Sequence, residues 1–393
     1  MTVNGTRRGD RLGGALLRPT AKAVPGHARA HNRSLVLGSL FHNGPLSRAE
    51  LARATGLTRV TVSDLVAELA RQDLIVETGT QTQSRVGKPG NLIDINADGH
   101  IIAVLDLSDV KTARGALISL RGAVLARREL PTGAATGAAM GEVAERLAAE
   151  LVQLVPPRGQ GGQPGARLLG VGVASPGVLA PSGEVVYAKD YQWANYPLAA
   201  RLRAKLPVPV HAANDANLRA LAEFTFAGAA AEGLIEVSLT DGLGAGILLD
   251  GALLLGPSNA AGEIGHIPAM VGGDPCTCGR RGCLETVLNR KVLRQAAGTA
   301  SGGGQEAALE RVGQATAAVL APIVSAFNLS DLVFADPRGL VTDEVLDAIS
   351  NGLAERLLPQ IATALNVRVS RLGADAALLG AGALVLSERL GLT

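Results

Sequence analysis

The strongest constraint on the fold of this chain is a short loop that contains all of its cysteines. Cys276, Cys278 and Cys283 stand within eight residues of a glycine-rich segment, and His266 lies just upstream. Three thiolates and one imidazole are a typical ligand set of closed tetrahedral zinc sites, and the glycines let the backbone turn tightly. Three ordinary thiols are the alternative, but unrelated cysteines would not gather beside a histidine. The loop therefore predicts a structural zinc site with these four side chains as ligands.

The length and composition predict a multidomain protein of the cytoplasm. A chain of 393 residues is too long for one compact core. No apolar run has the length of a signal peptide or of a membrane span, and loop thiols in such a chain fit a reducing compartment. Only 2% of the residues are aromatic, which argues against nucleic-acid binding by base stacking.

Residues 1–28 predict a basic, disordered leader. Basic side chains follow one another from Arg7 to Arg48, and only Asp10 opposes them. Such a segment can lie along DNA phosphates or can be a solvated tail, and its composition fits both.

Residues 29–97 have the pattern of a winged helix-turn-helix. Apolar residues at helical spacing predict a first helix over 32–41. Ser47 and Glu50 then form a capping box, which opens a second helix over 48–54. Two such helices followed by a turn glycine and a third helix resemble the helix-turn-helix, whose last helix enters the major groove of DNA.

The third helix and the segment after it carry the side chains expected to contact DNA. Thr58 caps this helix, which ends near residue 72, and its expected apolar positions are Val60, Val62, Leu65, Val66 and Leu69. The early exposed positions suit base edges and phosphates, and they are Thr58, Arg59, Thr61 and Ser63. Strands over 74–78 and 92–95 flank a basic loop, whose Arg85 and Lys88 would enter a narrow groove. A helical hairpin for protein contacts is the alternative, but the capping box, turn glycine and basic wing in series favour DNA.

From residue 100 to residue 393, apolar runs alternate with helical periods. The first block has expected strands at 101–107, 113–120, 123–130, 168–174 and 207–211, with a helix over 140–155. The second block has an expected strand at 234–239, a glycine-rich hairpin at 242–255, and helices over 306–328 and 342–365. A theme that occurs twice predicts two related α/β lobes with a ligand cleft between them.

Three motifs of this region resemble the signature of the ROK family of repressors and sugar kinases. They are Ala-Gly-Glu-Ile-Gly-His at 261–266 with the cysteine loop that ends Gly-Cys-Leu-Glu at 282–285, the glycine hairpin at 242–246, and Asn-Asp-Ala-Asn at 214–217. The resemblance covers about residues 30–393. It implies an α/β protein with an actin-like, two-lobed domain behind an N-terminal winged helix.

The resemblance also implies a sugar site, at Asn214, Asp215, Glu263, His266 and Glu285, with Asn195 and the segment 175–177 matching looser positions. The chemistry agrees, because each buried sugar hydroxyl needs a partner and carboxylates give strong hydrogen bonds. His266 could bind zinc through one ring nitrogen and the sugar through the other. Taken without the other motifs, Asn214 and Asp215 would be read as a turn or a helix cap.

The phosphate-binding segments argue against a kinase. Asp215 matches the kinase base, but the Asp-x-Gly-Gly-Thr of the kinases reads Asp-Leu-Ser-Asp-Val at 106–110. Their Gly-Thr-Gly reads Thr-Asp-Gly at 240–242, and their Gly-Gly turn at the adenosine reads Ala-Asp-Pro at 335–337. Added acids and side chains oppose ATP where phosphoryl transfer depends on positioning.

The sequence therefore predicts a sugar-responsive transcriptional regulator, most simply a repressor, that binds a palindromic operator as a homodimer or higher oligomer. Asp109 and Asp241 favour an unphosphorylated sugar. Two alternatives stay open: a ROK-type sugar kinase with an added DNA-binding head, and a constitutive DNA-binding dimer whose cleft takes no ligand.

Overall fold

The computed structural model describes residues 25–80, 91–156, 165–229, 233–240, 242–298 and 303–392. The leader up to residue 24, the predicted wing residues Arg85 and Lys88, and Asp241 lie outside the described residues. Within the described segments, no helix is both long and apolar enough to cross a bilayer.

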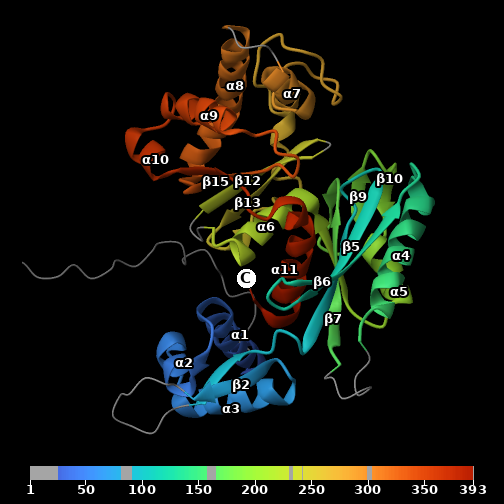
Figure 1. Cartoon of the computed structure of the whole chain (residues 1–393), viewed down its shortest axis with the longest axis vertical. Coiled ribbons are helices and arrows are strands. Elements are labelled where there is room, and N and C mark those ends of the chain that lie inside the picture. Colours follow the sequence, from blue (N-terminus) through green and yellow to red (C-terminus); the bar gives the residue numbers. More distant parts are fainter. Residues whose placement is uncertain are drawn as a thin grey trace, which may run out of the picture.

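The N-terminal head is a winged helix-turn-helix (Figure 1). Its elements are α1 (Pro25–Asn43), β1 (Leu46–Ser47), α2 (Arg48–Thr55), α3 (Arg59–Arg71), β2 (Ile75–Thr80) and β3 (Asn91–Ile95). The capping box is confirmed: the Ser47 hydroxyl accepts from the Glu50 amide, and the Glu50 carboxylate accepts from the Ser47 amide. Gly56 ends α2 at φ 71°, in the left-handed region that glycine adopts freely. α1 begins earlier than expected, so its first turn lies within the segment assigned to the leader.

One apolar position of the third helix is exposed. Val62, Leu65, Val66 and Leu69 are buried in the head, as expected, whereas Val60 is 72% exposed. The expectation for Val60 was wrong because the buried residues repeat at three- and four-residue steps, and a residue two positions before Val62 falls off that stripe. Val60 therefore lies on the outer side of α3.

The first lobe is a five-stranded sheet with helices against it. The strand order is β11-β7-β4-β5-β6, in which β4, β5 and β6 are antiparallel neighbours and β7 and β11 run parallel to β4. The strands are β4 (His100–Asp106), β5 (Thr112–Ser119), β6 (Val124–Pro131), β7 (Arg167–Ser175) and β11 (Val210–Asn214), and the helices are α4 (Gly137–Gln153) and α5 (Leu198–Lys205). A small sheet joins them, formed by β8 (Val178–Leu179), β9 (Val185–Ala188) and β10 (Trp193–Tyr196).

The second lobe repeats this sheet. Its order is β14-β13-β12-β15-β16, again with one antiparallel hairpin side and two parallel strands on the other. The strands are β12 (Gly233–Leu239), β13 (Leu243–Leu249), β14 (Ala252–Leu253), β15 (Asp331–Ala335) and β16 (Asn366–Val369), and the helices are α7 (Arg290–Gly298), α8 (Gly303–Phe327), α9 (Asp343–Ala354) and α10 (Pro359–Ala364). The prediction of two related α/β lobes is confirmed.

The single helix expected over 342–365 is two helices. α9 ends at Ala354 and α10 begins at Pro359. Leu358 has φ −60° and ψ 142°, because the ring of a following proline disfavours the helical conformation. Pro359 then occupies the first position of α10, where its missing amide proton is no loss.

Two helices lie between the sheets and join the lobes. α6 (Asp215–Phe226) and α11 (Ala376–Leu390) pack against each other at the centre of the molecule (Figure 1). A Cβ at Gly380 would lie 1.9 Å from the carbonyl oxygen of Leu218, so only glycine permits this approach. The two helices fix the position of the N-terminus of α6 between the lobes.

Candidate functional site

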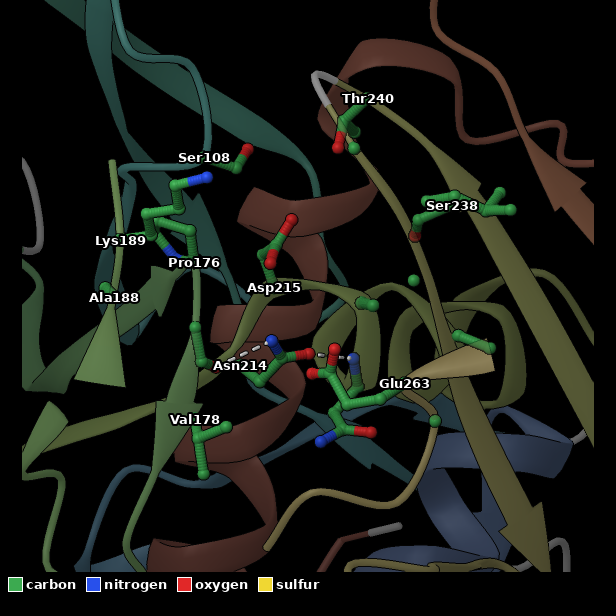
Figure 2. A pocket seen from close by; sticks show the side chains of 18 of the residues that line it. Ser108, Pro176, Val178, Ala188, Lys189, Asn214, Asp215, Ser238, Thr240 and Glu263 are labelled. Atoms are coloured by element: carbon green, nitrogen blue, oxygen red, sulfur yellow. Dashed lines mark hydrogen bonds between the residues drawn. The ribbon is translucent and has the colours of Figure 1, made fainter. Parts of the chain in front are cut away.

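A polar cavity of about 410 Å³ lies at the N-terminus of α6. It is lined by the turn after β7, the segment after β9, the ends of β12 and β13, the loop 259–266 and part of the cysteine loop. Figure 2 shows the carboxylate of Asp215 near the middle of this group, with Lys189 and Ser108 on one side and Ser238 and Thr240 on the other. The cavity thus draws on both lobes and suits a small, hydroxyl-rich ligand.

The structure brings five of the six expected sugar residues to this cavity. Asn214, Asp215, Glu263, His266 and Glu285 all line it. Asn195 is not among the lining residues; it lies on β10 with φ 50°, and its neighbours Trp193 and Tyr196 hold that strand against the helices of the first lobe. Of the looser positions, Pro176 and Gly177 line the cavity.

Asn214 acts as a helix cap within the cavity wall. Its Oδ1 accepts from the amide of Asn217 at 3.0 Å, and its Nδ2 donates to the carbonyl of Gly177 at 2.9 Å (Figure 2). The capping interpretation therefore holds for this residue even with the other motifs present. The cap fixes where α6 begins and so where the next side chain, Asp215, points.

Asp215 is a buried carboxylic acid with an arginine neighbour. It is 8% exposed, and its Oδ2 lies 3.4 Å from Nη2 of Arg219, one turn along α6. Burial raises the pKa of Asp215 to about 6, while Arg219 lowers this pKa and the nearby Asp106 raises it further. The carboxylate is therefore a strong hydrogen-bond acceptor at neutral pH, held in a site that disfavours its charge.

Acids at the predicted nucleotide positions have partners within the protein. Asp106 is fully buried, accepts from the amide and hydroxyl of Ser108 at 2.9 and 2.6 Å, and pairs with Arg114. The carboxylate of Asp336 accepts from the backbone amides of Arg338, Leu340 and Val341. These carboxylates stabilise the turns in which they stand.

Two loops meet beside the cavity and form a candidate metal centre. The ligand atoms of His266, Cys276, Cys278 and Cys283 lie within 4.8 Å of one another. Sγ of Cys278 is 3.6 Å from Sγ of Cys283, and Sγ of Cys276 is 3.6 Å from Nδ1 of His266. A tetrahedral zinc ion with bonds of about 2.3 Å to sulfur separates its sulfurs by about 3.8 Å. The cluster therefore fits a metal ion of this size.

Nδ1 is the nitrogen of His266 that lies beside the thiols. Oε2 of Glu285 lies 3.7 Å from both that nitrogen and Sγ of Cys276. His266 and Glu285 both line the cavity as well, so Nε2 is the ring atom left for a ligand.

Gly262 fixes the position of the loop that carries Glu263. It has φ 96°, and a Cβ there would lie 1.9 Å from the carbonyl oxygen of Ala245. Because only glycine permits this close approach, the loop that carries Glu263 lies directly against β13.

Sequence reasoning missed several wall residues. Lys189 follows β9, and Ser238 is the penultimate residue of β12, where its hydroxyl donates to the buried Glu236 at 2.9 Å. Burial raises the pKa of Glu236 well above its usual value. These residues belong to no motif, and only the chain path brings them to Asp215.

The expected DNA-contact residues that can be described lie together at the start of α3. Thr58, Arg59 and Ser63 are exposed and Thr61 is half-buried. The Thr58 hydroxyl accepts from the amide of Thr61 at 3.2 Å and pairs with the hydroxyl of Thr61 at 2.9 Å. The two threonines therefore begin the helix, and their hydroxyls bond each other.

Comparisons with known proteins cover both parts of the chain. The ROK family profile matches residues 110–388, and the MarR family profile matches residues 31–85. The chain is 26% identical to the xylose repressor of Bacillus spizizenii over 91% of this chain and 96% of that protein. It is 31% identical to an N-acetylmannosamine kinase of Escherichia fergusonii, over 73% of this chain and 98% of the kinase.

The fold is shared with a solved structure. A ROK family transcriptional regulator described as a homologue of the E. coli MLC protein superposes with a TM-score of 0.79 at 24% identity, over 93% of this chain and 98% of that one. The chain belongs to the ROK family, and a MarR-type winged helix precedes its ROK domain.

Proposed function

We propose that this protein is a sugar-responsive transcriptional repressor, which leaves its operator when a sugar binds between the two lobes. The observation that carries this proposal is the presence, in one chain, of a winged head and a polar interlobe cavity. The xylose repressor of Bacillus spizizenii matches across both parts. The roles proposed for the cavity residues are hydrogen bonds to sugar hydroxyls from Asp215, Glu263, His266 and Glu285, with Asn214 holding the start of α6.

The metal in this proposal is structural zinc. The ligand chemistry of three thiols and one imidazole favours zinc over harder ions. Held by its four ligands, the ion would fix the loop that carries Thr277 and Glu285 into the cavity. The DNA partner is a palindromic operator read by a homodimer or higher oligomer, with Arg59 and Ser63 of α3 and Arg85 and Lys88 of the wing as contacts.

A sugar kinase is the second candidate, since Asp215 is retained and a kinase is among the relatives. Asp109 and Asp336 disfavour it, because each carboxylate stands where the kinases have a glycine, at the expected phosphate turn and adenosine turn. A coupled assay of ADP release with free hexoses, pentoses and N-acetylamino sugars separates the two candidates.

The test of the proposed function combines ligand screening with DNA binding. A thermal-shift screen of free and phosphorylated sugars is expected to find a stabilising ligand, because a ligand of the folded state raises its stability. That ligand is then added to the protein bound to a duplex selected from a random library. Release of the duplex supports the repressor, whereas a ligand that leaves the duplex bound, or robust ADP release, contradicts it.

Helix α6 connects the cavity to the head, and we propose that it transmits the effect of sugar binding. It spans about 18 Å, with Asp215 in the cavity at one end and Phe226 at the other. The ring of Phe226 packs edge-on against Phe41 of α1 at 6.2 Å between centroids. Beside it, Arg121 of the β5–β6 turn donates to the carbonyls of Leu40 and Phe41 and pairs with Asp94 of β3.

Removal of the Phe226 ring is expected to uncouple sugar binding in the cavity from operator binding by the head. Allosteric coupling is typically about 1–3 kcal/mol, so sugar should weaken operator binding about 5- to 150-fold in the unmodified protein. In Phe226→Ala we expect no more than about twofold weakening, with unchanged sugar affinity, because the contact between α6 and α1 is lost. Fluorescence anisotropy of a labelled duplex with and without sugar measures this.

The matched control is Phe327→Ala, at an exposed phenylalanine of the second lobe. This variant should keep the full response. A Phe226→Ala protein that releases DNA as well as the control does would rule out this route.

A further inference from the structure

The recognition helix presents one apolar side chain to its surroundings. Val60 is the second residue of α3 and is 72% exposed, whereas Val62 and Leu65 of the same helix are fully buried or nearly so. A β-branched residue lowers helix propensity slightly, so at an exposed position it does nothing for the stability of the head. Its neighbours Arg59 and Ser63 are exposed polar residues, and Val60 is therefore an isolated apolar group within a polar surface.

At Val60, the surface of α3 that is expected to face DNA lacks a hydrogen-bonding side chain. The hydroxyls of Thr58 and Thr61 bond each other at 2.9 Å, and Thr58 also caps the helix. Much of the hydrogen-bonding capacity of these two hydroxyls is therefore satisfied within the protein. The early residues of a recognition helix are those that reach base edges, so at this point the surface offers methyl groups in place of donors or acceptors.

We infer that Val60 is a specificity-determining residue, whose methyl groups pack on the 5-methyl group of a thymine in the major groove. Thymine is the one base that presents a methyl group there, and apolar side chains contact it. A cytosine at that position would put a bare C5–H against the valine and add an amino donor with no acceptor on the valine side chain. The inference rests on the proposed function, because it requires operator DNA.

The test removes the 5-methyl group of thymine and, separately, the two methyl groups of Val60. Duplexes are selected from a random library with the full-length protein, and each thymine of the selected site is replaced in turn by deoxyuridine, which lacks only the 5-methyl group. Loss of one buried methyl is expected to weaken binding about fourfold at one thymine of each half-site. In Val60→Ala the same replacement should change affinity by less than about 1.5-fold, because the packing partner is already gone.

Arg59→Ala is the control for weakened binding in general. This variant should bind the selected duplex and its deoxyuridine version less tightly than the unmodified protein does. The affinity ratio between the two duplexes should stay the same as in the unmodified protein. If every replacement affects Val60→Ala as much as the unmodified protein, or affects neither, the inference about Val60 is wrong while the repressor stands. If the unmodified protein enriches no sequence at all, the inference and the proposed function fail together.

Discussion

Replacing Cys278 by serine is expected to remove the bound metal and abolish the sugar response in one step. A serine hydroxyl is a poor zinc ligand, and a site with three remaining ligands would bind far more weakly. The free energy of zinc binding in small structural sites is about 10–16 kcal/mol, enough to order a glycine-rich loop. Thr277 and Glu285 of this loop line the cavity, so we expect sugar affinity to fall about 100-fold.

The measurement pairs metal content with two affinities. Metal bound per chain should fall from one to near zero, and calorimetry should show the loss of sugar binding. Operator affinity without sugar should be unchanged, since the buried residues of the head belong to another hydrophobic cluster than those beside the cysteine loop. Arg281→Ser is the matched control, because this exposed residue lies in the same loop and is not a ligand. Loss of metal with an intact sugar response would contradict a role for the metal in the cavity.

Replacing Asp215 by asparagine is expected to stabilise the protein while it weakens sugar binding. The folded protein raises the pKa of this group from 3.8 to about 6, so the folded state binds the proton more tightly than the unfolded state does. The stability that the protonated group supplies is therefore fully present below pH 4 and is lost as the pH rises towards 6. A shift of this size corresponds to about 3 kcal/mol at neutral pH, part of which asparagine recovers because it carries no charge.

The sugar loses a charged acceptor in the same variant. Hydrogen bonds to charged groups contribute about 1.5–3 kcal/mol, so affinity should fall by one to two orders of magnitude. Urea unfolding at pH 7 and pH 4, together with calorimetry, measures both effects. The stability difference between Asp215→Asn and the unmodified protein should be largest at pH 7 and should shrink at pH 4.

Asp250→Asn is the control for the loss of a negative charge, because Asp250 is an exposed residue of the β13–β14 turn. It should change neither stability nor sugar binding. A less stable Asp215→Asn protein at pH 7 would show that the pair with Arg219 outweighs the burial of the carboxylate.

The parts of the fold that local chemistry determines were predicted from the sequence. The capping box at Ser47 and the cap at Thr58 depend on residues three positions apart, and the turn at Gly56 depends on a single glycine; all three are as expected. The cluster of His266 with the three cysteines was also predictable, because its ligands are close in sequence and chemically distinctive.

What could not be predicted depends on segments far apart in the chain. Strands β15 and β16 and helix α11 carry no motif, and their places follow from the sheet order and from packing on α6. Val60 fitted an apolar pattern whose buried face only the packed head defines. Asn195 matched a family position in sequence, but it lies on β10 and is not among the residues that line the cavity.

The small sheet that forms one wall of the cavity has a practical consequence. Trp193 is the single tryptophan of the chain, is 1% exposed, and stacks on Tyr196 at 4.6 Å between centroids. Its indole nitrogen donates to the carbonyl of Gly137 at 2.7 Å. The strand that pairs with it, β9, supplies Tyr187 and Ala188 to the cavity. Tryptophan fluorescence therefore has one emitter, which lies directly behind this wall of the cavity, and its spectrum can follow movement of this lobe without a label.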